Sequence, residues 1–309
     1  MNRRTMLTST AAGALFGSTA NSAVAASTQS PPSSKPLAEF VSTDDGTRLY
    51  CKTWGAGAPV VFVHSWAMSS DMWQYQTVEL ADRGLRCITY DRRGHGRSEQ
   101  PSSGYDIDTL ADDLARVIDA HELADVTLVG HSMGGGEIVR YLTRHSRERV
   151  ARIVLLAPTT PCLQQSADNP DGVPPHAFEA VRAQWRQDFP KWVADNTRPF
   201  FVQETSEAMM RWGTDMLLRT SLPVAIECNR ALTTADFRAE MRDITTPALI
   251  VHGDADASAP LSLTGAKSAK LLPNCELKVY PGAPHGLFIT HATQVNADIM
   301  RFIASTPTA

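Results

Sequence analysis

The pentapeptide Gly130-His131-Ser132-Met133-Gly134 constrains the fold more than any other stretch of this 309-residue chain. It fits the pattern G-x-S-x-G, in which a serine occupies a sharp turn between a strand and a helix. The preceding residues 125–129 are apolar and β-branched and predict a buried strand, whereas residues 133–145 read as a helix. Because so tight a turn has no room for side chains at its two glycines, we expect a strained Ser132 whose hydroxyl is pushed out at the top of the sheet.

A serine nucleophile needs a histidine as base and a carboxylate that orients the histidine. With this turn, the acid and then the histidine follow the serine along the chain. Residues 248–253 read as a strand that ends next to Asp254 and Asp256, and the following predicted strand leads to His285. Since the carboxyl ends of parallel strands meet at one edge of a sheet, these side chains can converge on Ser132.

Four stretches carry a resemblance to a known family: Asp71-Met72-Trp73, Tyr90-Asp91-Arg92-Arg93-Gly94-His95-Gly96-Arg97-Ser98, Gly130 through Gly136, and Ala283-Pro284-His285-Gly286. With them the chain resembles the α/β-hydrolases and, more narrowly, their branch of cofactor-free haloperoxidases, aryl esterases and perhydrolases. The resemblance covers most of the chain after about residue 40. It implies an α/β-hydrolase fold, with a mostly parallel sheet flanked by helices and an inserted helical cap.

The resemblance also implies a catalytic triad of Ser132, Asp256 and His285. The family pattern Gly-x-x-Asp, counted from Gly253, reaches Asp256. Asp254 remains open as the alternative, since either carboxylate could reach a histidine from a flexible loop. His64 and His131 are expected to hold loops beside the site.

The backbone N–H groups of Trp66 and Met133 are the expected oxyanion hole, the first by resemblance and the second by geometry. The family usually has His-Gly where this chain has His64-Ser65. Because serine tolerates a positive φ poorly, we expect this loop to be shifted. Peroxide-using members often carry proline after the tryptophan, and Ala67 stands there instead, which favours an esterase over a perhydrolase.

The expected function is hydrolysis of small aryl or alkyl carboxylic esters through an acyl-serine, with neither metal nor organic cofactor and with perhydrolysis as a side reaction. One alternative is a haloperoxidase or perhydrolase that makes peracids from a carboxylate and hydrogen peroxide. A second is a catalytically silent binding protein on a hydrolase scaffold.

The sequence divides into five parts. Residues 37–160 and 237–309 are expected to form the hydrolase core, and residues 161–236 the helical cap. Aromatic and methionine side chains at helical spacing run through the cap segment, and a few of them are expected to line an apolar pocket over the nucleophile. Residues 26–36 read as a linker.

Residues 1–25 read as an export signal. The pair Arg3-Arg4 with Met6-Leu7 behind it is typical of twin-arginine signals, and Ala23-Val24-Ala25 fits a cleavage site. The sequence therefore predicts a periplasmic or secreted protein without a stable membrane anchor. A tail that stays attached, or a lipid-anchored arm, is the alternative.

Charge and cysteine content narrow the partners. The formal net charge is −4 and no basic patch occurs, which argues against a nucleic-acid partner. The expected partner is a small apolar ester, the substrate of the predicted chemistry. Neither C-x-x-C nor H-E-x-x-H occurs, so no zinc site is predicted. Cys51, Cys87 and Cys275 are expected to be buried, and a Cys162–Cys228 disulfide stays open.

Overall fold

The computed structural model describes residues 39–305. The predicted export signal, 1–25, and linker, 26–36, lie outside these residues. In chain order the helices and strands are β1 (Phe40–Ser42), β2 (Arg48–Trp54), β3 (Ala58–Val63), η1 (Ser70–Trp73), α1 (Gln74–Asp82), β4 (Leu85–Tyr90), α2 (Ile107–Ala120), β5 (Val126–His131), α3 (Met133–Arg144), η2 (Arg147–Arg149), β6 (Val150–Leu156), α4 (Pro175–Asn196), η3 (Arg198–Phe200), α5 (Glu207–Leu218), α6 (Leu222–Thr234), α7 (Arg238–Asp243), β7 (Ala248–Gly253), α8 (Gly265–Leu271), β8 (Cys275–Tyr280), α9 (Leu287–Thr290) and α10 (Ala292–Ser305).

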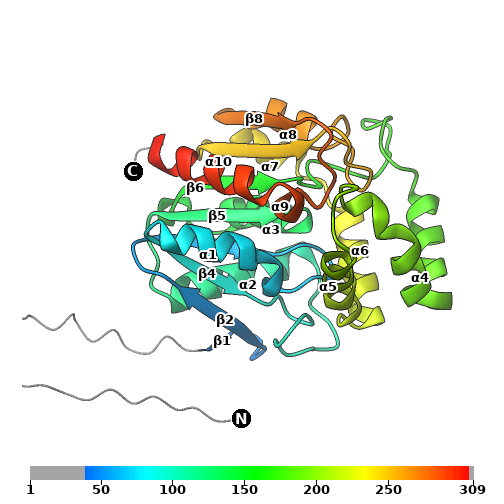
Figure 1. Cartoon of the computed structure of the whole chain (residues 1–309), viewed down its shortest axis with the longest axis horizontal. Coiled ribbons are helices and arrows are strands. Elements are labelled where there is room, and N and C mark those ends of the chain that lie inside the picture. Colours follow the sequence, from blue (N-terminus) through cyan, green and yellow to red (C-terminus); the bar gives the residue numbers. More distant parts are fainter. Residues whose placement is uncertain (1–38, 306–309) are drawn as a thin grey trace, which may run out of the picture. The chain divides into compact units, whose positions relative to one another are not determined.

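The strands form one eight-stranded sheet in the order β1-β2-β4-β3-β5-β6-β7-β8 (Figure 1). β1 and β2 pair antiparallel at one edge, and every pair from β4 to β8 is parallel. This agrees with the predicted α/β fold. Since parallel strands share a direction, the turns after β3, β5, β6, β7 and β8 all emerge at the same edge.

Each face of the sheet is covered by helices, because alternate side chains of every central strand point to opposite faces. Val61 and Val63 of β3 belong to a core cluster that includes side chains of α2 and α3. Val60 and Phe62 belong to the other cluster, with side chains of α1 and α10. The result is a three-layer arrangement with the sheet between two layers of helices.

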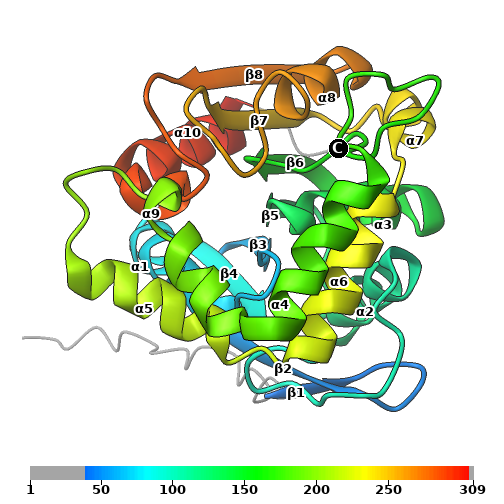
Figure 2. The same cartoon turned by 90° about the vertical axis from the view of Figure 1, so that its right-hand side faces the viewer.

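A helical segment with α4, α5 and α6 connects β6 to β7, and Figure 2 shows it standing in front of the strand ends. α4 bends where Asp188 leaves the helical conformation, two residues before Pro190. Proline within a helix removes a backbone hydrogen bond and so favours such a kink. α4 therefore consists of two helical segments joined at the kink.

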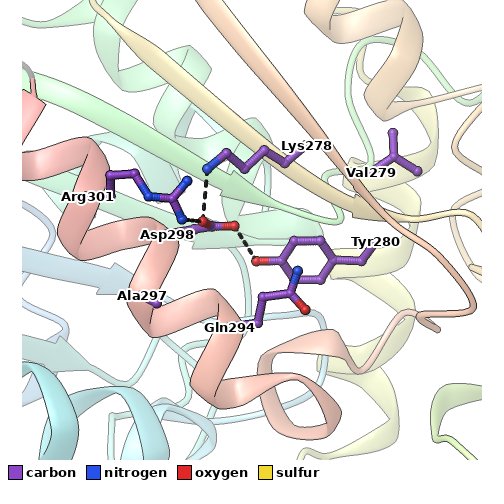
Figure 3. Close-up of a pocket in the computed structure, with 7 residues that line it drawn as sticks. All are labelled: Lys278, Val279, Tyr280, Gln294, Ala297, Asp298 and Arg301. Atoms are coloured by element: carbon purple, nitrogen blue, oxygen red, sulfur yellow. Dashed lines mark hydrogen bonds and ion pairs between the residues drawn. The ribbon is translucent and has the colours of Figure 1, made fainter.

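The edge strand β8 is fastened to α10 by Asp298, whose side chain is almost fully buried (Figure 3). Its carboxylate accepts from Lys278 Nζ at 2.9 Å and from the Tyr280 hydroxyl at 2.6 Å, and Arg301 also contacts it. Charge-assisted bonds of this kind are the stronger hydrogen bonds in proteins. The cluster therefore anchors the strand that leads into His285.

All five cysteine thiols are free, so Cys162 and Cys228 are not bridged although both are buried. Cys51 and Cys87 are buried as predicted, whereas Cys275 is partly exposed, because β8 lies at the edge of the sheet. Among residues 39–305, no helix combines the length and the apolar character that a bilayer crossing requires.

Candidate active site

Ser132 sits in a strained turn between β5 and α3, with φ 55° and ψ −116°. Both flanking glycines are needed for steric reasons. A Cβ on Gly134 would lie 2.5 Å from the Val63 carbonyl oxygen, and one on Gly130 would lie 2.8 Å from the backbone of Gly134. The Ser132 N–H donates to the Leu156 carbonyl at 3.0 Å. The turn is thus wedged against β3 and β6, which fixes the serine.

His285 and Asp256 are joined directly. Nδ1 of His285 lies 2.6 Å from Oδ2 of Asp256, and both side chains are buried. Asp254 instead accepts a hydrogen bond from the Gly282 N–H at 2.6 Å and is exposed. Of the two carboxylates that follow β7, only Asp256 is in contact with the histidine.

The Asp256 carboxylate is held from three sides. Oδ1 accepts from the backbone N–H groups of Ser258 and Ala259 at 2.9 and 2.8 Å, and Nε2 of His252 lies 3.1 Å from Oδ2. Burial by itself raises the pKa of Asp256, but His285, His252 and the Ala259 N–H together outweigh it and lower the pKa well below its usual range. The group therefore stays ionised beside the imidazole.

His131 supports the backbone of His285. Its Nε2 lies 2.8 Å from the His285 carbonyl oxygen, and the two rings are 4.7 Å apart. Burial holds the pKa of His131 well below its usual value, so the ring is neutral and Nε2–H is the donor. The expectation that His131 holds a loop beside the site fits this contact.

The backbone N–H groups of Trp66 and Met133 have no hydrogen-bond partner among the described residues. They follow β3 and β5, whose carboxyl ends are adjacent. The loop that contains Ser65 was expected to be shifted, because serine tolerates a positive φ poorly, and Ser65 does not adopt one. The positive φ of this loop, 53°, falls on Ala67, because residues 65–68 form a turn in which the Met68 N–H bonds back to the Ser65 carbonyl at 3.4 Å.

A buried ion pair that the sequence did not reveal lies behind this loop. Arg92 and Glu137 pair with almost no exposure. The Arg92 guanidinium also donates to the carbonyl oxygens of His64 and Ser65, at 2.7 and 3.2 Å. Arg92 belongs to one of the stretches that carried the resemblance, but no local pattern pointed to these contacts. The pair fixes the peptide that precedes the Trp66 N–H.

Ser132 and His285 line one cavity of about 480 Å³ under the helical segment. No hydrogen bond joins their side chains in the part of the chain that the structure describes. Most of the wall is apolar. Its aromatic residues are Trp66, Phe178, Trp185, Trp192, Phe200 and Phe201.

Comparison with known proteins agrees with this geometry. Residues 58–292 match the family model described as alpha/beta hydrolase fold. The chain is 38% identical to the non-heme chloroperoxidase CPO-A1 of Kitasatospora aureofaciens, over 84% of this chain and 98% of that protein. It is 34% identical to the bifunctional esterase/perhydrolase DCH of Acinetobacter calcoaceticus, over 86% and 99%.

A solved structure described as a bromoperoxidase from Bacillus anthracis superposes with a TM-score of 0.83 at 33% identity, covering 86% of this chain and 99% of that one. The fold, the turn at Ser132 and the relatives lead to the same placement: this chain belongs to the alpha/beta hydrolase family, in the branch of the non-heme haloperoxidases and their esterase relatives.

Proposed function

We propose that the protein is a serine esterase that cleaves small carboxylic esters through an acyl-Ser132 intermediate. The observation that carries the proposal is the shared cavity, which exposes Ser132 to His285 while Asp256 holds the imidazole at 2.6 Å. Ser132, His285 and Asp256 are the proposed nucleophile, base and orienting acid.

In the proposed reaction, Ser132 Oγ attacks the ester carbonyl while Nε2 of His285 takes its proton. The carboxylate of Asp256 keeps the proton on Nδ1 and stabilises the imidazolium. The free N–H groups of Trp66 and Met133 donate to the tetrahedral oxyanion. The imidazolium then protonates the leaving alcohol, and water, deprotonated by His285, releases the acid and regenerates the serine.

Perhydrolysis is the second candidate, favoured by relatives described as haloperoxidases and as an esterase/perhydrolase. Hydrogen peroxide would replace water in the second half-reaction and release a peracid, which oxidises halide away from the protein. The two reactions share every step up to the acyl-serine. They differ only in the nucleophile that the loop at residues 65–68 admits.

A panel of p-nitrophenyl and aryl esters of increasing chain length, assayed with and without hydrogen peroxide, tests both candidates. We expect saturable ester turnover, with weaker peroxide-dependent bromination of an activated diketone in acetate buffer. Absence of ester turnover and of bromination in folded protein would leave the binding-protein alternative standing.

We further propose that residues 1–25 direct export by the twin-arginine route. The support is the sequence pattern alone. Replacing Arg3 and Arg4 by lysine should leave an uncleaved precursor inside the cell. Normal secretion of that variant would contradict the proposal.

A further inference from the structure

One polar group in the largely apolar cavity is fixed in orientation. Arg182, which is buried, donates from Nη1 to the Asn229 side-chain oxygen at 2.7 Å. A guanidinium can only donate, so this bond fixes the oxygen of the amide towards Arg182 and its NH₂ group away from it. That NH₂ group has no acceptor among the described residues, and Asn229 lines the cavity. The cavity wall therefore carries a preset hydrogen-bond donor.

A second unpaired group lies in the same wall. The Thr159 hydroxyl is buried, lines the cavity and has no partner in the described part of the chain. The Phe237 N–H bonds to the Pro161 carbonyl at 2.8 Å and so ties the segment after Thr159 to the turn between α6, the helix that carries Asn229, and α7. A buried polar group without a partner is energetically unfavourable, and a ligand oxygen that accepts from it removes that cost.

The position of this wall decides which part of an ester it meets. His285 protonates the leaving alcohol, so the alcohol lies beside His285 and the acyl group extends away from it. α9 follows His285 directly, and Figure 2 shows α6 across the strand ends from α9. Leu232 of α6 packs on the core cluster that contains Met133. Phe200, which contacts the His285 ring, packs on the other cluster. The wall formed by α6 therefore lies away from His285, on the side towards which the acyl group extends.

We infer that the preferred acyl group carries an acceptor oxygen, such as a keto oxygen, that binds the Asn229 amide and the Thr159 hydroxyl. Glu179 pairs with Arg182 at 2.8 Å and offsets its charge, so the structure favours a neutral oxygen over a carboxylate. The inference rests on the proposed esterase function and narrows it to oxo-acyl esters.

Two isosteric substrate pairs test the inference. The p-nitrophenyl esters of 4-oxopentanoate and 5-oxohexanoate are compared with those of 4-methylpentanoate and 5-methylhexanoate. Each kcat/KM ratio is divided by the corresponding ratio for alkaline hydrolysis, which removes intrinsic reactivity. The native protein should favour the oxo ester of at least one pair by about 3–10-fold, the value of one or two hydrogen bonds. A normalised ratio of one for both pairs would overturn the inference.

The variants identify the donor. Asn229→Asp keeps the bond to Arg182 but replaces the NH₂ group by an acceptor oxygen, so the preference should fall to one or below; Asn229→Leu should act likewise. Asn196→Leu is the matched control, because Asn196 also lines the cavity but donates to the Trp192 carbonyl at 2.8 Å, so the preference should persist. An oxo preference retained in Asn229→Asp would refute the assignment. If the folded protein hydrolysed none of the four esters, the esterase proposal itself would be refuted.

Discussion

Asp256→Asn is the sharpest perturbation of the proposed site, because it changes one atom type in a fixed frame. The two N–H groups of Ser258 and Ala259 donate to Oδ1 and will hold the amide oxygen of asparagine there. The NH₂ group must then replace Oδ2 and face His285 Nδ1 across 2.6 Å. Two donors cannot share that contact, so the proton of His285 moves to Nε2 and the ring can no longer accept the Ser132 proton.

The magnitude follows from losing the productive tautomer. In serine proteases the same exchange lowers kcat by about 10⁴, or roughly 5.5 kcal/mol of transition-state stabilisation. The nearby His252 increases the expected loss of turnover, because its Nε2 lies 3.1 Å from Oδ2 and would also face the new NH₂ group. We therefore expect ester turnover to fall by at least about 10⁴-fold.

The assay is p-nitrophenyl acetate hydrolysis by native, Asp256→Asn and Asp254→Asn proteins with matching thermal melts. Asp254→Asn is the control: it loses only a contact to the Gly282 N–H, so its turnover should change by less than about threefold. If Asp254→Asn were the more damaging substitution in folded protein, the assignment of the acid would be refuted.

Three further predictions concern the loop at residues 65–68, the turn at Ser132 and the Asp298 cluster that joins β8 to α10. Ala67→Pro should raise the ratio of peracid formation to ester hydrolysis. Proline fixes φ near −65° where Ala67 has 53°, so the peptide group that carries the Trp66 carbonyl must rotate. An unchanged ratio would contradict this explanation. Gly134→Ala should lower the free energy of unfolding by about 1–3 kcal/mol, because its Cβ would clash with the Val63 carbonyl oxygen. Gly135→Ala is the control and should cost much less, because its Cβ would lie 3.2 Å from Pro158. Equal melting temperatures of the two variants would contradict this prediction. Asp298→Asn should cost about 1–3 kcal/mol at pH 7 in urea unfolding. Burial raises the pKa of Asp298, but Tyr280 and Lys278 lower it more, so its contribution exists above about pH 4 and disappears as the pH falls further; a gap that widens in acid would contradict this.

The sequence predicted the turn at Ser132, because its signal lies in neighbouring residues, and it predicted the order of the three polar residues, because that order accompanies this type of turn. The strand before Ser132 and the strands before Asp256 and His285 are readable one by one, and parallel pairing brings their ends together. The residues alone could not separate Asp254 from Asp256. Both follow the same strand, and the choice is made by a contact to Gly282 in another turn.

The rest of the site depends on packing between distant elements. Arg182 meets Asn229 across 47 residues only because α4 and α6 lie together, and no periodicity encodes that. The loop after β3 was expected to be shifted because a serine stands at residue 65, whereas the positive φ falls on Ala67, inside the turn that the Met68 N–H closes onto the Ser65 carbonyl. The φ values in a turn are set by the conformation of all four residues together, so one residue type does not predict them.

Active-site labelling tests the central claim most directly. Native protein treated with a fluorophosphonate should lose ester turnover as one equivalent of label attaches to the peptide that contains Ser132. Folded Ser132→Ala should take no label and retain less than about 10⁻⁴ of native turnover. A folded Ser132→Ala variant that still hydrolyses p-nitrophenyl acetate, or a native protein labelled at another serine, would contradict the account.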